Sequence, residues 1–147
     1  MTPSIARPLG RLDPETSGWL PVTPCTVLLV DDDSDMRHYL RTCLRSPRLQ
    51  VGRVLETDDG LEALHLARTT GVDLIISDIV IPGLDGRALC RAIRAIPDFD
   101  QVSLLLISGE DGPGLDACAD AFLPKPFNSQ QLLAVLEGLL PDGSLKP

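Results

Sequence analysis

Four apolar runs in this chain each end in a polar or charged residue, at the point where a buried strand would end. The runs, with the residues that follow them, are 27–30 with Asp31 and Asp32, 74–76 with Asp78, 104–107 with Ser108, and 122–123 with Lys125. Stretches of helical spacing separate the runs, so we expect parallel strands whose carboxyl ends share one edge of a sheet. That edge would gather three carboxylates, a hydroxyl and an ammonium group, which together suit a divalent cation and a phosphoryl group.

The order of strand and helix patterns predicts the fold class. Expected strands cover residues 26–30, 51–57, 72–77, 102–107 and 121–123. Amphipathic helical patterns lie between them, and we expect Ser34 to cap the first helix, Gly71 to end the second and Ser129 to cap the last. This alternation predicts an α/β fold: a flavodoxin-like, doubly wound, five-stranded parallel sheet of order 2-1-3-4-5 with helices on both faces.

The fourth helix is expected to be shortened. Gly109, Gly112, Pro113 and Gly114 follow the fourth strand. They leave only residues 115–119 for this helix, which is room for about one or two turns.

The chain divides into a domain and two flanking segments. Residues 1–24 hold five prolines and no sustained periodicity, which predicts a flexible N-terminal arm. Trp19 is unusual in such an arm, and we expect it to dock weakly or not at all. Residues 25–141 would form the folded domain, and residues 142–147 a C-terminal tail.

Charge and cysteine usage exclude several functional classes. The net charge is −8 and the basic residues form no stripe, which disfavours binding to nucleic acids or anionic membranes. The four cysteines include no C-x-x-C pair and have no nearby histidine, so they indicate reduced thiols and no zinc or redox motif. No signal peptide or membrane-spanning run is evident, and we expect a cytoplasmic protein.

The expected sheet edge has a specific chemistry. The first and third strands of such a sheet are neighbours where the winding reverses, which places Asp31, Asp32 and Asp78 together. Close carboxylates repel one another and suit a hard cation, and Mg²⁺ binds one or two of them while leaving room for a phosphate oxygen. Asp78 is then available as a nucleophile towards phosphorus. Lys125 would offset charge on the phosphoryl oxygens, and Ser108 would donate a hydrogen bond to one of them.

Four sequence blocks carry a family resemblance. They are VLLVDDDSDMR (27–37), DLIISDIVIPGLDG (73–86), LLLISGE (104–110) and AFLPKPF (121–127). In this order they resemble the receiver domain of bacterial two-component response regulators, from about residue 26 to residue 140. The resemblance implies a protein that accepts a phosphoryl group from a histidine kinase or a histidine phosphotransfer protein. Such a protein is a switch and not an enzyme, although it has limited autophosphorylation and autodephosphorylation activity.

The resemblance also implies an acceptor and a metal site. Asp78 corresponds to the phosphoacceptor, Asp32 to the direct metal ligand, and Asp31 to the acid that holds a metal-bound water. Asp78 itself and the main-chain carbonyl of Val80 would also bind Mg²⁺, and Mn²⁺ could take the place of Mg²⁺. The apolar side chain of Val80 is a departure from the family, because it cannot orient a hydrolytic water. We therefore expect a longer-lived aspartyl phosphate unless Glu110 orients that water.

The remaining family positions concern the response to phosphorylation. Ser108 corresponds to the switch hydroxyl, Phe122 to the aromatic switch residue, and Lys125 to the invariant lysine. A cis peptide bond is expected before Pro126. The shortened fourth helix lies in the surface that most receivers use for output, so that interface is not transferred to this chain.

Two alternatives remain open. A haloacid-dehalogenase-like, Mg-dependent phosphatase would use Asp31 as nucleophile and Asp33 as acid, but no Gly-Thr follows Asp33 and no acidic pair follows Lys125. The second alternative is a non-phosphorylated pseudo-receiver, an interaction module of the same fold. A calcium loop beginning at Asp31 is excluded, because Met36 stands where such a loop needs glycine and Thr42 where it needs glutamate.

The end of the chain leads to a further expectation. Only 22 residues follow Lys125, and most of them fit the last helix. We therefore expect a stand-alone response regulator, either monomer or homodimer. Its output would pass through an unknown downstream protein or a phosphorelay, without direct contact with nucleic acid or membrane.

Overall fold

The structure is a computed structural model that describes residues 11–13, 18–20, 24–109 and 118–140. The strands of its main sheet are β3 (Cys25–Val30), β4 (Val51–Thr57), β5 (Leu74–Asp78), β6 (Ser103–Ser108) and β7 (Ala121–Pro124). They pair in parallel in the order β4-β3-β5-β6-β7. Counted from β3, this is the predicted order 2-1-3-4-5, and the predicted fold class is confirmed.

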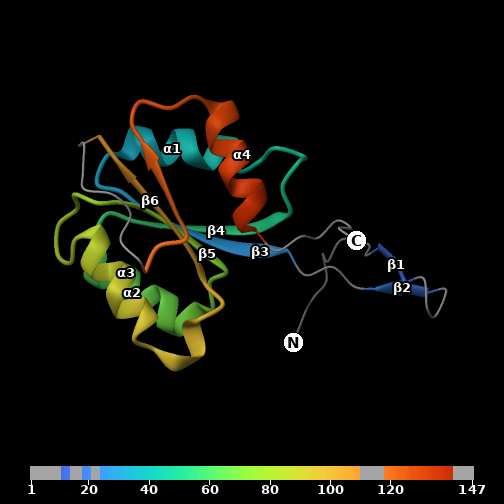
Figure 1. The fold of residues 1–147 in the computed structure, drawn as a ribbon, viewed down its shortest axis with the longest axis horizontal. Helices are drawn as coiled ribbons and strands as arrows, with labels where there is room; N and C mark the ends of the chain where they lie inside the picture. Colours follow the sequence, from blue (N-terminus) through green and yellow to red (C-terminus); the bar gives the residue numbers. More distant parts are fainter. Residues whose placement is uncertain (1–10, 14–17, 21–23, 110–117, 141–147) are drawn as a thin grey trace.

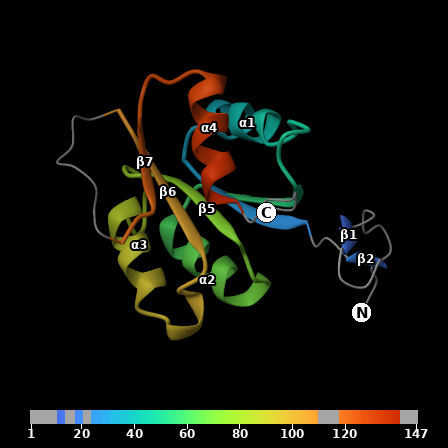
Figure 2. The same cartoon turned by 45° about the vertical axis from the view of Figure 1, so that its right-hand side comes forward.

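In the described ranges, four α-helices cover the two faces of this sheet. They are α1 (Ser34–Cys43), α2 (Gly60–Thr70), α3 (Gly86–Arg94) and α4 (Ser129–Leu139), and a 3-10 turn, η1 (Pro97–Phe99), follows α3. Figures 1 and 2 both show α1 and α4 on one face and α2 and α3 on the other. Among the described residues, no helix has the length and apolar character needed to cross a bilayer.

Each face of the sheet has its own core. Alternate residues of β3 point to opposite faces: Val27 and Leu29 belong to the core under α1 and α4, whereas Leu28 and Val30 belong to the core under α2 and α3. All four side chains are fully buried. A strand buried on both faces reads as a continuous apolar run, which is why these strands were recognisable in the sequence.

Two of the predicted helix caps are wrong by one residue. Asp33, not Ser34, caps α1, because its carboxylate accepts hydrogen bonds from the main-chain N–H groups of Asp35 and Met36. Asn128, not Ser129, caps α4 and exchanges side-chain to main-chain hydrogen bonds with Gln131. In both cases two adjacent residues were good caps, and the earlier one has the extended conformation that a cap requires.

The predicted end of α2 is confirmed. Gly71 follows the helix with a φ of 73°, in the left-handed region that favours glycine.

The segment expected to be an arm contains a short ribbon. β1 (Arg11–Asp13) pairs antiparallel with β2 (Gly18–Leu20) outside the main sheet. The proposed boundaries of the arm, domain and tail remain predictions. The shortened fourth helix, expected at residues 115–119, falls mainly on residues 110–117, which lie outside the described residues.

Candidate functional site

The predicted site residues lie at the carboxyl edge of the sheet. The register pairs Val30 with Ser77 and Asp78 with Ile107. Asp31 directly follows β3 and Asp78 is the last residue of β5, so the two lie at the same end of neighbouring strands. Ser108, at the end of β6, pairs with Pro124, and Lys125 follows directly. The fold therefore brings Asp31, Asp78, Ser108 and Lys125 to one edge, as the four strand endings predicted.

Asp78 and Lys125 form an ion pair at the centre of this edge. The Lys125 Nζ donates to Asp78 Oδ2 at 2.9 Å, and the Val80 main-chain N–H donates to Asp78 Oδ1 at 3.2 Å. Burial by itself lowers the pKa of Lys125. The hydrogen bond and charge of Asp78, together with the charges of Asp31 and Asp33, outweigh burial and raise that pKa above its ordinary value. Lys125 is thus a cation at neutral pH, held against the Asp78 carboxylate.

Asp31 carries a buried carboxylate oxygen without a partner. Its side chain is 1% exposed, and Oδ1 accepts a hydrogen bond from the Asp33 main-chain N–H at 2.9 Å. Within the described part of the chain, Oδ2 has no hydrogen-bond partner. Burial raises the pKa of Asp31, and the negative charges of Asp78 and Asp32 raise it further, although the Asp33 N–H and Lys125 offset part of the effect. An unpartnered, partly desolvated carboxylate oxygen beside two other carboxylates is a donor that a hard cation would take.

The remaining candidate ligands belong to residues that are more exposed than Asp31. Asp32 is exposed, and the Val80 side chain is 59% exposed. No three His, Cys, Asp or Glu side chains of the described residues form a ready-made metal centre. Mg²⁺ typically takes one or two carboxylates and keeps several waters, so this edge fits Mg²⁺ better than a metal that needs a full protein cage.

The two switch positions lie on β6 and β7. Ser108 is buried, and its main-chain carbonyl accepts a hydrogen bond from the Lys125 N–H at 2.8 Å. Phe122 is half-buried on β7, in register with Leu106. The Lys125–Pro126 peptide bond is cis, as predicted.

Sequence reasoning missed two neighbours of the site. Arg37 on α1 donates to the main-chain carbonyl of Asp31 and pairs with Glu56 of β4 at 3.0 Å. The sequence spacing between Arg37 and Asp31 does not predict this contact. Gly86, at the start of α3, lies so close to Asp78 that an added Cβ would be 2.5 Å from the Asp78 carbonyl oxygen. The sequence predicted a turn at residues 82–86 that includes Gly86, but not the closeness of Gly86 to Asp78.

Comparison with known proteins identifies the family. The family described as response regulator receiver domain matches residues 27–137. Response regulator MprA of Mycobacterium sp. (strain KMS) is 38% identical over 122 residues, which are 80% of this chain and 51% of that protein. The chain thus spans about half the length of the curated relatives it matches.

Solved structures of receiver domains have the same fold. The chemotaxis response regulator CheY4 of Vibrio cholerae is 30% identical with a TM-score of 0.71, covering 80% of this chain and 100% of that one. The receiver domain of sensor histidine kinase PA1611 from Pseudomonas aeruginosa PAO1 is 28% identical with a TM-score of 0.70, covering 80% and 98%. That structure has a magnesium ion coordinated in the active site cleft. The resemblance seen in the four sequence blocks is therefore confirmed, and this chain belongs to the response regulator receiver domain family, a family of two-component signalling switches.

Proposed function

We propose that this protein accepts a phosphoryl group on Asp78 from a phosphohistidine of a sensor kinase or a histidine phosphotransfer protein. One observation carries the proposal: the Asp78 carboxylate is paired with Lys125, beside the unpartnered buried oxygen of Asp31. Asp31, Asp32, Asp78 and the Val80 carbonyl would hold Mg²⁺, or Mn²⁺ in its place. When bound, the cation supplies positive charge to the oxygens of the transferring group.

In the proposed reaction an Asp78 carboxylate oxygen attacks phosphorus. The bond from phosphorus to the donor imidazole nitrogen breaks, its electron pair stays with that nitrogen, and an acyl phosphate forms on Asp78. Lys125 is positioned to offset charge on a phosphoryl oxygen, since its Nζ already lies 2.9 Å from Asp78 Oδ2. The Ser108 hydroxyl would donate a hydrogen bond to another oxygen, and Phe122 would respond as the aromatic switch.

The proposal extends to output and location. The labelled protein would act as a switch and not as a turnover enzyme, through a protein partner or a phosphorelay. The stand-alone organisation remains a prediction. A cytoplasmic location agrees with the four cysteines, which all lie in the described part of the chain and form no disulfide.

Intact-mass spectrometry tests the acceptor assignment. After incubation with Mg²⁺ and acetyl phosphate or phosphoramidate, the wild type should gain one phosphoryl group, and Asp78→Asn should gain none. Chelation of Mg²⁺ should suppress the adduct on the wild type. An equal adduct on Asp78→Asn, or none on the wild type with either donor, would contradict the proposal.

The side chain of Val80 is expected to slow hydrolysis of the acyl phosphate. It is apolar and exposed two residues after Asp78, so it offers no hydrogen bond to an attacking water. Val80→Asn should shorten the lifetime of the phosphorylated protein, by roughly tenfold if an oriented water lowers the barrier by about 1.4 kcal/mol. The decay of the adduct mass measures this lifetime. Leu61→Asn is the matched control, because Leu61 is also 59% exposed; equal decay of wild type and Val80→Asn would refute the expectation.

A further inference from the structure

The corner between α1 and β4 is basic although the chain is acidic. Residues 36–55 contain five arginines and no Asp or Glu, whereas the whole chain has a net charge of −8. Three of these arginines are in ion pairs with two carboxylates: Arg37 and Arg41 share Glu56, and Arg48 pairs with Glu137. The other two are Arg45 and Arg53. In the described ranges neither of them is in an ion pair, so the corner retains positive charge.

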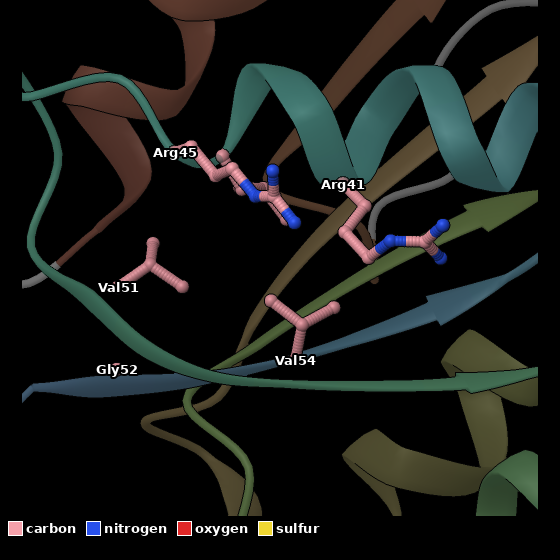
Figure 3. A pocket seen from close by; sticks show the side chains of 6 residues that line it. Arg41, Arg45, Val51, Gly52 and Val54 are labelled. Atoms are coloured by element: carbon pink, nitrogen blue, oxygen red, sulfur yellow. The ribbon is translucent and has the colours of Figure 1, made fainter.

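A hollow of about 290 Å³ lies in this corner. It is lined by Arg41 of α1, by Leu44 and Arg45 in the turn that follows α1, and by Val51, Gly52 and Val54 of β4. Figure 3 shows the side chains of Val51 and Val54 pointing from β4 toward α1, with Arg41 extending from the helix and Arg45 from the turn that follows it. The hollow therefore combines an aliphatic floor with guanidinium groups at its margin.

The hollow opens beside an edge of the sheet. β4 is the outermost of the five strands, and no strand of the described residues pairs with its outer side. Gly52 is an extra residue in β4, since Cys25 pairs with Val51 and Thr26 with Arg53. Gly52 places no side chain over the hollow. An edge strand beside an aliphatic hollow can receive an extended peptide.

We infer that the hollow and the adjacent edge of β4 are a docking site for an extended acidic segment of a partner protein. An aliphatic side chain of that segment enters between Val51 and Val54, and a neighbouring carboxylate binds Arg45. A guanidinium group binds a carboxylate through two parallel hydrogen bonds, which suits this pairing.

The local charge and the edge strand favour this occupant over others. Arg45 and Arg53 leave the corner positive, which attracts an acidic segment even though the whole chain has a net charge of −8. The edge of β4 pairs with main-chain N–H and C=O groups, which a polypeptide has and which nucleic acids and lipids lack. The inference rests on the α1–β4 corner and does not depend on the phosphoryl chemistry at Asp78.

Fluorescence polarisation with the full chain tests this inference. The probe is a short labelled peptide of alternating glutamate and leucine, compared with versions that carry lysine for glutamate or serine for leucine. The glutamate–leucine peptide should bind best. Arg45→Glu should weaken its binding by at least about tenfold, or about 1.4 kcal/mol, and Arg45→Lys by less. Arg68→Glu, an equal charge change on an exposed residue of α2, is the matched control and should leave binding unchanged.

Several results would overturn the inference. These are absence of binding, equal weakening by Arg45→Glu and Arg68→Glu, or equal affinity for the serine peptide. Tighter binding of an oligonucleotide or of vesicles containing phosphatidylglycerol would also overturn it, as would a concentration-dependent dimer that Arg45→Glu dissociates. Phosphorylation of Arg45→Glu by acetyl phosphate should match that of the wild type. A failure of the docking inference is therefore distinguishable from a failure of the proposed function.

Discussion

Replacing Asp31 with asparagine is expected to stabilise the metal-free protein and to remove most of the stabilisation that Mg²⁺ gives. Asp31 is buried, and its Oδ2 has no partner among the described residues. Asparagine has nearly the same shape but no charge, so it removes a buried negative charge beside Asp78 and Asp32, and we expect a gain of about 1–3 kcal/mol in the free energy of unfolding. For the wild type, Mg²⁺ at 1,000 times its Kd should add about 4.1 kcal/mol, which exceeds the upper end of that range. The order of stability of the two proteins should therefore reverse when Mg²⁺ is added.

Denaturant unfolding with chelator and with saturating Mg²⁺ measures this reversal. Asp120→Asn is a poor control, because Asp120 binds Arg94 and the Leu104 N–H. Asp98→Asn is a better one, since Asp98 is an exposed carboxylate in η1, away from the sheet edge. Asp98→Asn should change neither the stability of the metal-free protein nor the stabilisation by Mg²⁺. Equal Mg²⁺ stabilisation of the wild type and Asp31→Asn would show that Asp31 is not part of the metal site.

The pH dependence of the metal-free proteins provides a second test of Asp31. Burial raises the pKa of Asp31 in the folded state, so folding favours its protonated form. The destabilisation is therefore complete above the raised pKa and is lost as the pH falls through it toward the usual value of an aspartate. The advantage of Asp31→Asn over the wild type should be largest near pH 7 and should shrink in acid. An advantage that grows in acid would contradict this account.

Replacing Lys125 with methionine is expected to reduce both phosphorylation and stability. The change keeps most of the side-chain volume but leaves the Asp78 carboxylate, whose side chain is 12% exposed, without its cationic partner. We expect a loss of about 1–3 kcal/mol in the free energy of unfolding and roughly a hundredfold slower adduct formation with acetyl phosphate. Lys125→Arg is the matched control for charge. It should recover stability better than reaction rate, because the guanidinium group has a different geometry.

A double-mutant cycle separates the ion pair from other effects of the Lys125 substitution. In the Asp78→Asn background, Lys125→Met should cost clearly less stability, because the carboxylate it would leave unpaired is gone. An unchanged cost would mean that the 2.9 Å contact contributes nothing to stability.

The sequence predicts those site residues that lie at the ends of strands. Asp31, Asp78, Ser108 and Lys125 each follow or end an apolar run, and parallel strands necessarily bring such positions to one edge. The specific pairing of Lys125 with Asp78 was not predictable in this way. It depends on the register between β5, β6 and β7 and on a side-chain conformation, neither of which leaves a local pattern in the sequence.

Other features escaped the sequence for local physical reasons. Asp33 and Ser34 are both good helix caps, so composition alone could not place the start of α1. The β1–β2 ribbon lies in a proline-rich segment whose strands of three residues are too short to show periodicity. The pairing of Arg37 with Glu56 joins residues 19 positions apart on different elements, which no spacing rule covers.

Localisation of the acyl phosphate tests the central claim most directly. The protein is phosphorylated with Mg²⁺ and acetyl phosphate, and borohydride then reduces the acyl phosphate to an alcohol that marks the modified aspartate for peptide mass mapping. The mark should appear on Asp78 and on neither Asp31 nor Asp32. A mark on Asp31 would instead support the haloacid-dehalogenase-like chemistry and would contradict the assignment of Asp78 as the phosphoacceptor.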